Sequence, residues 1–86
     1  MRSQQDIDNI IQEVQTKLDA YQKRTGISLR VPKDGYIQDD PWLNVVVTPT
    51  SPGVRAHQYV DALEELEKEL RKNGHKDVLL VPASAN

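Results

Sequence analysis

The chain has 86 residues, 13 acidic and 11 basic side chains, no cysteine, and a net charge of −2 with histidine neutral. Its length suits a single small domain over residues 1–86, with 83–86 as a frayed tail. The lack of cysteine excludes disulfides, cysteine-ligated zinc and thiol nucleophiles. No apolar run approaches the roughly 18 residues of a membrane span, and residues 1–6 lack the apolar core of a signal peptide. We therefore expect a soluble, cytoplasmic protein that has no contact with membranes.

The first predicted element is an amphipathic helix. Ser3 and Asp6 have the spacing of a capping box, and Thr25 and Gly26 provide the stop. Packing in the core is the expected role of its apolar stripe, and pairing with a helix of a second chain is the alternative. The stripe consists of Ile7, Ile10, Ile11, Val14, Leu18 and Tyr21.

Three or four strands follow from composition and alternation. Residues 27–31 alternate apolar and polar side chains, which predicts a half-exposed strand, and 36–38 is a brief strand after a turn. Residues 42–48 and 78–81 are β-branched and nearly continuously apolar, which is typical of strands covered on most of both faces.

A second amphipathic helix is predicted over 52–73. Ser51 is a suitable N-cap, Pro52 suits the first helical position, and Gly74 favours a left-handed stop. On its charged face, Glu64–Lys68 and Glu67–Arg71 have the favourable order for ion pairs one turn apart. Its apolar face comprises Ala56, Tyr59, Val60, Leu63, Leu66 and Leu70.

These elements predict an α+β, two-layer α/β fold in the order α-β-(β)-β-α-β. Its three- or four-stranded sheet is mixed, because a strand, a helix and a strand with short connections form a parallel pair. One right-handed β-α-β crossover is expected from 42–48, 52–73 and 77–81.

The two apolar strands carry more hydrophobic surface than a two-layer monomer can cover. If both helices pack on one face, part of the other face stays in water, and such a patch usually marks an interface. We therefore expect a homodimer, unless the helices lie on opposite faces and cover both. Trp42 is either a core side chain or an anchor in the interface. The candidate interface residues are Trp42, Leu43, Val45, Val47, Leu79 and Val81.

The connection between 42–48 and the second helix is a candidate ligand site. Strand ends diverge there and helix amides point outward, so hydroxyls, amides and a guanidinium could hold a phosphate or carboxylate. The sequence matches neither a Walker A loop nor a dinucleotide-binding turn, and an ordinary capped connection is the structural alternative. The candidate residues of this connection are Thr48, Thr50, Ser51, Gly53, Arg55 and His57.

Chemistry beyond binding has little support in the sequence. His57 and His75 are not at metal-ligand spacing, so we expect no metal, no cofactor and no catalytic residue. An enzyme whose site is completed across a dimer would depend on Arg55, His57 and the tyrosines. The net charge of −2 argues against nucleic-acid binding, which normally needs a basic face. The sequence therefore favours a non-catalytic binding or assembly module that self-associates and engages another protein in a regulatory or adaptor role. The alternative is a domain that binds an anionic metabolite at 48–55.

Overall fold

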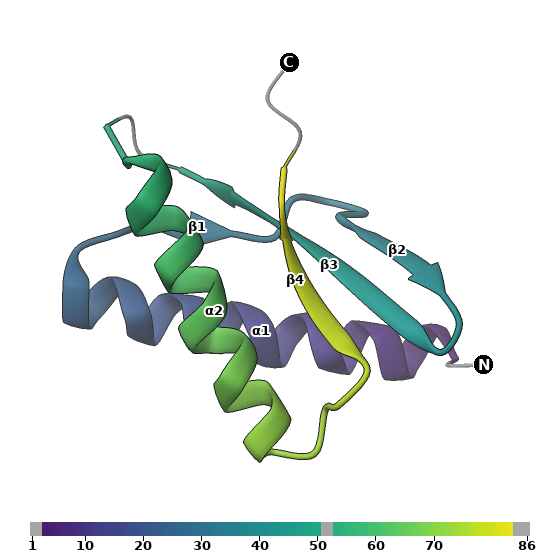
Figure 1. Cartoon of the computed structure of the whole chain (residues 1–86). Coiled ribbons are helices and arrows are strands. Elements are labelled where there is room, and N and C mark those ends of the chain that lie inside the picture. Colours follow the sequence, from purple (N-terminus) through teal and green to yellow (C-terminus); the bar gives the residue numbers. More distant parts are fainter. Residues whose placement is uncertain (1–2, 51–52, 84–86) are drawn as a thin grey trace.

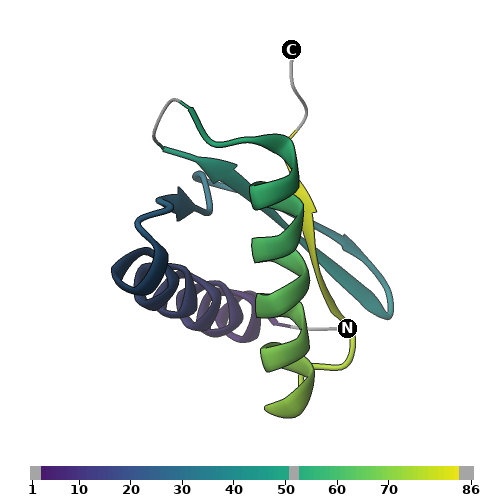
Figure 2. The ribbon, with the colours of Figure 1, turned by 60° about the vertical axis from the view of Figure 1, so that its left-hand side comes forward.

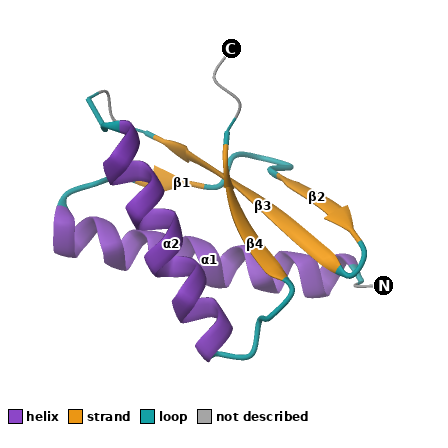
Figure 3. Ribbon diagram, in the orientation of Figure 1, coloured by secondary structure: helices purple, strands orange, loops and turns teal. Residues whose placement is uncertain are grey.

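The computed structural model of the chain describes residues 3–50 and 53–83. In this part, two helices lie against a four-stranded sheet, which makes a small two-layer α+β domain (Figure 1). The extents are 37 × 30 × 18 Å, and the short third extent fits one layer of helices on one layer of strands. The elements (Figure 3) are α1 (Gln4–Thr25), β1 (Leu29–Arg30), β2 (Tyr36–Asp39), β3 (Trp42–Pro49), α2 (Ala56–Lys72) and β4 (Val78–Pro82).

Helix α1 confirms the first predicted helix and both of its ends. The Ser3 hydroxyl accepts the Asp6 amide at 3.1 Å, and the Asp6 carboxylate accepts the Ser3 amide at 3.4 Å, so the capping box is complete. At the other end, Gly26 has a φ of 81° and donates its N–H to the Gln22 carbonyl. Glycine adopts this left-handed conformation without the steric penalty of a side chain. The buried part of its stripe is Ile7, Val14, Leu18 and Tyr21.

Strand β3 is central, and the other three strands pair with it. Strand β2 is antiparallel to its first half (42–45), β1 is antiparallel to its end (48–49), and β4 runs parallel beside 43–47. The sheet is therefore mixed, and β3 and β4, which α2 connects, form the predicted parallel pair.

Strands β1 and β2 share one edge of β3, and β4 occupies the other. The Val46 and Thr50 amides donate toward the β2 and β1 side, whereas the Leu43 amide donates to the Asp77 carbonyl beside β4. Because successive amides of a strand point to opposite edges, even-numbered residues of β3 bond toward β1 and β2 and odd-numbered ones toward β4. The four-stranded sheet is thus at most three strands wide.

Both helices cover the same face of this sheet, as Figure 2 shows. Leu43, Val45 and Val47 are 0% exposed, whereas Asn44 and Val46 between them are only half-buried. Period-2 burial along a central strand means that one face is packed and the other is not. In β4 the packed positions are Val78 and Leu80, which lie opposite Leu43 and Val45.

Helix α2 begins four residues later than the sequence predicts. The predicted start at Ser51 and Pro52 lies outside the described residues, and Gly53 has a φ of 90°, which a right-handed helix cannot contain. The N-cap is Arg55, in extended conformation, and its amide donates to the Gln58 side chain at 3.1 Å. The positive φ of Gly53 thus moves the helix start to Ala56.

Two further predictions need correction. The first strand is two residues long instead of five, because the next residue that could donate to β3 after Arg30 is Pro32, which has no amide hydrogen. The Val31 amide points away from β3 and donates to the Gln15 side chain at 3.0 Å. Val60, placed on the apolar face of the second helix, is 48% exposed. The buried face of α2 is narrower than its periodicity suggests and consists of Ala62, Leu63, Leu66 and Leu70.

The chain beyond β4 is held at its first residue. The Ala83 amide donates to the Val47 carbonyl at 3.1 Å and to the Tyr59 hydroxyl at 3.0 Å, and that hydroxyl itself donates to the Val47 carbonyl. The sequence predicts a frayed tail over 83–86, but Ala83 is hydrogen-bonded, and 84–86 lie outside the described residues. The Tyr59 hydroxyl thus ties α2 to the ends of both parallel strands.

Candidate functional site

The candidate site is the face of the sheet that the helices leave uncovered, which we call the open face. Its membership follows from register, since directly paired residues point to the same side. Val46 pairs with Val81, and Asn44 pairs with both Leu79 and Ile37. The open face comprises Arg30, Ile37, Asp39, Trp42, Asn44, Val46, Thr48, Leu79 and Val81.

Large apolar side chains dominate the open face. Ile37 is 61% exposed and Trp42 is 42% exposed, and both are on outer parts of this face. Val46, further along β3, and Leu79 and Val81, on β4, are half-buried on the same face. Single exposed apolar residues are ordinary, but a contiguous group on one flat surface is typical of an interaction site.

The sequence-predicted interface residues divide between the two faces. Leu43, Val45 and Val47 are packed against the helices in the domain's own core. Trp42, Leu79 and Val81 lie on the open face, so Trp42 is not a core side chain. The structure adds Ile37 and Val46 to these three. Alternation separates odd from even positions in the sequence, but only packing decides which set faces the helices.

The charges of the open face lie at its two ends. Arg30 is beside Thr48 near the end of β3, and Asp39 is beside Trp42 at its start. Six residues of strand separate these positions, a span of about 20 Å at roughly 3.3 Å per residue. Both side chains are exposed, and neither makes an ion pair with another residue that the structure describes.

The connection predicted to bind an anion is only partly assembled. Thr50 bonds to Ser28 through both its hydroxyl and its amide, which anchors the connection to the residue before β1. Gly53 and His57 are exposed, and Arg55 is the N-cap of α2.

The remaining two candidate residues, Thr48 and Ser51, add nothing to a site in this connection. Thr48 belongs to β3 and points to the open face, and Ser51 lies outside the described residues. Among the described members of this group, no hydrogen bond or ion pair joins one to another. Because α2 begins at Ala56, Gly53 lies before the helix and its amide is not one of the free amides of the first helical turn.

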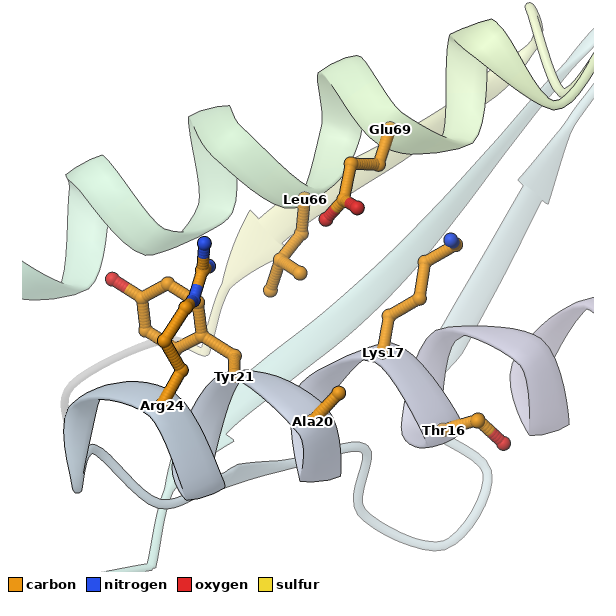
Figure 4. Close-up of a pocket in the computed structure, with 7 residues that line it drawn as sticks. All are labelled: Thr16, Lys17, Ala20, Tyr21, Arg24, Leu66 and Glu69. Atoms are coloured by element: carbon orange, nitrogen blue, oxygen red, sulfur yellow. The ribbon is translucent and has the colours of Figure 1, made fainter.

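A surface hollow of about 370 Å³ lies between α1 and α2 (Figure 4). Its apolar part comes from Tyr21, Ala20 and Leu66, with Lys17 and Glu69 reaching in from opposite helices. Sequence periodicity did not predict it, because its outline depends on how the helices cross. Its remaining lining residues are Thr16 and Arg24.

Two polar contacts tie α1 to α2 and to the turn that follows α2. The Arg24 guanidinium pairs with Glu65 and lies 5.1 Å from the centroid of the Tyr21 ring. His75 Nε2 lies 3.0 Å from a Glu13 carboxylate oxygen. Arg24 and His75 therefore have structural contacts that hold α1 against α2 and the turn that follows it.

Over residues 3–50 and 53–83, no three His, Asp or Glu side chains form a group that could hold a metal ion. In the same described ranges, no helix is both long and apolar enough to span a bilayer. No protein-family model, curated protein or solved structure matches this chain.

Proposed function

We propose that this protein is a non-catalytic assembly module that self-associates by packing a second copy of the chain on its open face. The observation that carries the proposal is the exposed apolar surface of Ile37 and Trp42 on a sheet face without a helix. Burying apolar surface contributes roughly 25 cal/mol per Å², and two sheets that pack face to face exclude water from both at once.

Association through the outer edge of β4 is less favourable than association through the face. Glu67 on α2 accepts the Leu80 amide at 3.1 Å, and Pro82 has no amide. The backbone groups of even-numbered residues of β4 point away from β3, so the amide of Leu80 and the nitrogen of Pro82 lie on the outer edge of the strand. A carboxylate and a proline at such positions protect an edge strand from pairing with another chain.

The size of the open face sets the expected strength of association. Three strand widths of about 4.8 Å and six residues of strand give an area of about 14 Å by 20 Å. This is smaller than the roughly 800 Å² that each partner contributes to a standard stable interface. We therefore expect a weak, reversible dimer, which forms as concentration rises.

Val46→Lys tests the proposal, because Val46 is half-buried on the open face at the middle of β3. A lysine there puts a charge at the centre of the interface without entering the core. Sedimentation velocity from about 1 µM to 1 mM should show wild-type dimers, and Val46→Lys should weaken them at least about tenfold.

Val60→Lys is the matched control. It makes the same chemical change at an exposed valine of α2, on the helical side of the molecule, and should leave dimerisation unchanged. Circular dichroism confirms that both variants fold. A wild-type chain that stays monomeric up to 1 mM would refute the proposal, as would equal loss of dimer in both variants.

A further inference from the structure

We propose that the second copy packs antiparallel, with Arg30 of each protomer against the partner's Asp39. This inference rests on the proposed self-association and adds the orientation and the residues that determine it. Arg30 and Asp39 are the two charged members of the open face and occupy opposite ends of it.

Their positions across the strands matter as much as their positions along them. Strands β1 and β2 lie on the same edge of β3, so Arg30 and Asp39 are both on that side. The pairing partners Thr48 and Trp42 are symmetric about Val45, which lies three residues from each. The two charges are therefore mirror-related along β3, with the apolar residues between them and toward β4.

One two-fold axis satisfies both charges. A C₂ interface places the same surface of each protomer against the other. Consider a two-fold axis that lies between the two sheets, runs perpendicular to the strands and passes beside Val45. It makes β3 of the partner antiparallel to β3 of the first protomer. It also places the partner's β1–β2 edge over the β1–β2 edge of the first protomer. Arg30 then faces the partner's Asp39 at one end, and the symmetric pair forms at the other.

An axis along the strands gives a different result. It moves the partner's β1–β2 edge over β4. At the levels of Trp42 and Thr48, the register of β4 continues to Asp77 and Ala83, so Asp39 would approach a second carboxylate and Arg30 would have no acidic partner. That arrangement desolvates two unpaired charges and is disfavoured. Face-to-face sheets keep their strands within about 30° of each other, so the antiparallel arrangement is also compatible with sheet twist.

Charge reversal tests this orientation in trans. Arg30→Asp alone puts two carboxylates against each other at both ends of the dimer, and Asp39→Arg alone puts two guanidinium groups there. Each single variant should dimerise about tenfold more weakly than the wild type in sedimentation at low salt. Mixing the two variants creates a heterodimer in which both contacts are attractive again, and its affinity should return to within about threefold of the wild type.

The double variant Arg30→Asp/Asp39→Arg should also recover the wild-type affinity, because both contacts are inverted. Lys68→Asp and Glu64→Arg, on the exposed side of α2, are controls with similar charge changes and should leave dimerisation unchanged. Circular dichroism verifies the fold of every variant.

The outcomes separate this inference from the proposed function. Dimerisation that is indifferent to single reversals, or single reversals that do not complement each other in the mixture, would refute the antiparallel orientation and leave self-association standing. A wild-type chain that stays monomeric would refute both.

Discussion

A single carboxylate, that of Glu67, joins α2 to β4. One of its oxygens pairs with Arg71 at 2.6 Å, which confirms the ion pair predicted from the helical spacing. The other accepts the Leu80 amide from β4. The pair predicted one turn earlier on the helix, Glu64 with Lys68, does not form in the structure, although both residues are described. A contact with a strand, and not helical spacing alone, distinguishes the two glutamates.

Glu67→Ala should lower the free energy of unfolding by about 1 kcal/mol, because it leaves the part-buried Leu80 amide without its acceptor. Glu67→Gln keeps an acceptor oxygen and should lose less. Glu64→Ala, which changes helix propensity equally, should stay within about 0.5 kcal/mol of the wild type. Urea denaturation measures all three, and equal midpoints for Glu67→Ala and Glu64→Ala would contradict the proposed role of Glu67 at the edge.

At the scale of elements, the two helices begin in different ways. Helix α1 has a serine N-cap whose hydroxyl accepts an amide of the first turn. Helix α2 has Arg55 in the equivalent extended conformation, but an arginine side chain has no acceptor to offer, and no acidic residue lies in the first turn. A cation at this position also opposes the helix dipole. The start of α2 is therefore not optimised for stability.

Arg55→Ser should stabilise the protein, because serine at an N-cap accepts an amide of the first turn. The comparison variant is Arg55→Ala, which removes the same positive charge without adding an acceptor. We expect Arg55→Ser to exceed Arg55→Ala by about 1 kcal/mol in the free energy of unfolding, measured by thermal or urea denaturation. No difference between them would mean that α2 begins elsewhere than Ala56.

At the scale of the whole molecule, the strand edges differ in how well they are covered. Strand β3 is paired on both sides, and the outer edge of β4 is protected by Glu67 and Pro82. In β2, the amides of Tyr36 and Gln38 point away from β3. The Tyr36 amide donates to the Asp34 carbonyl, and the Gln38 amide lies on the outer edge of the strand. Protection from solvent should therefore be uneven across the sheet.

Hydrogen exchange followed by NMR should show the slowest amides in β3, at Val45 and Val46, because they exchange only when the sheet opens. The Gln38 amide should exchange much faster, since it points away from β3. Spectra recorded at protein concentrations below and above the dissociation constant of the dimer provide the control. Protection of Gln38 that appears on dimerisation would contradict packing through the open face and would indicate pairing through β2.

Local sequence signals predicted the elements with good accuracy. The capping box and Gly26 determine both ends of α1, because the interactions that form them span only three to four residues. The parallel pairing of β3 and β4 followed from the helix between them. The start of α2 was predicted wrongly because a serine and a proline outweighed the glycine that follows them, and Gly53 adopts a conformation that ends any helix.

The candidate site was predictable only in part. From the apolar strands the sequence determined that hydrophobic surface exceeds what two helices can bury on one face, and that the strands carry it. It also determined the alternation that separates two sets of side chains in each strand. Only the tertiary structure decided which set is covered, because strand periodicity is identical for both faces, and the choice depends on where helices distant in sequence pack. The placement of Arg30 and Asp39 at opposite ends of one face is likewise a consequence of strand pairing, which brings together residues that no local signal connects.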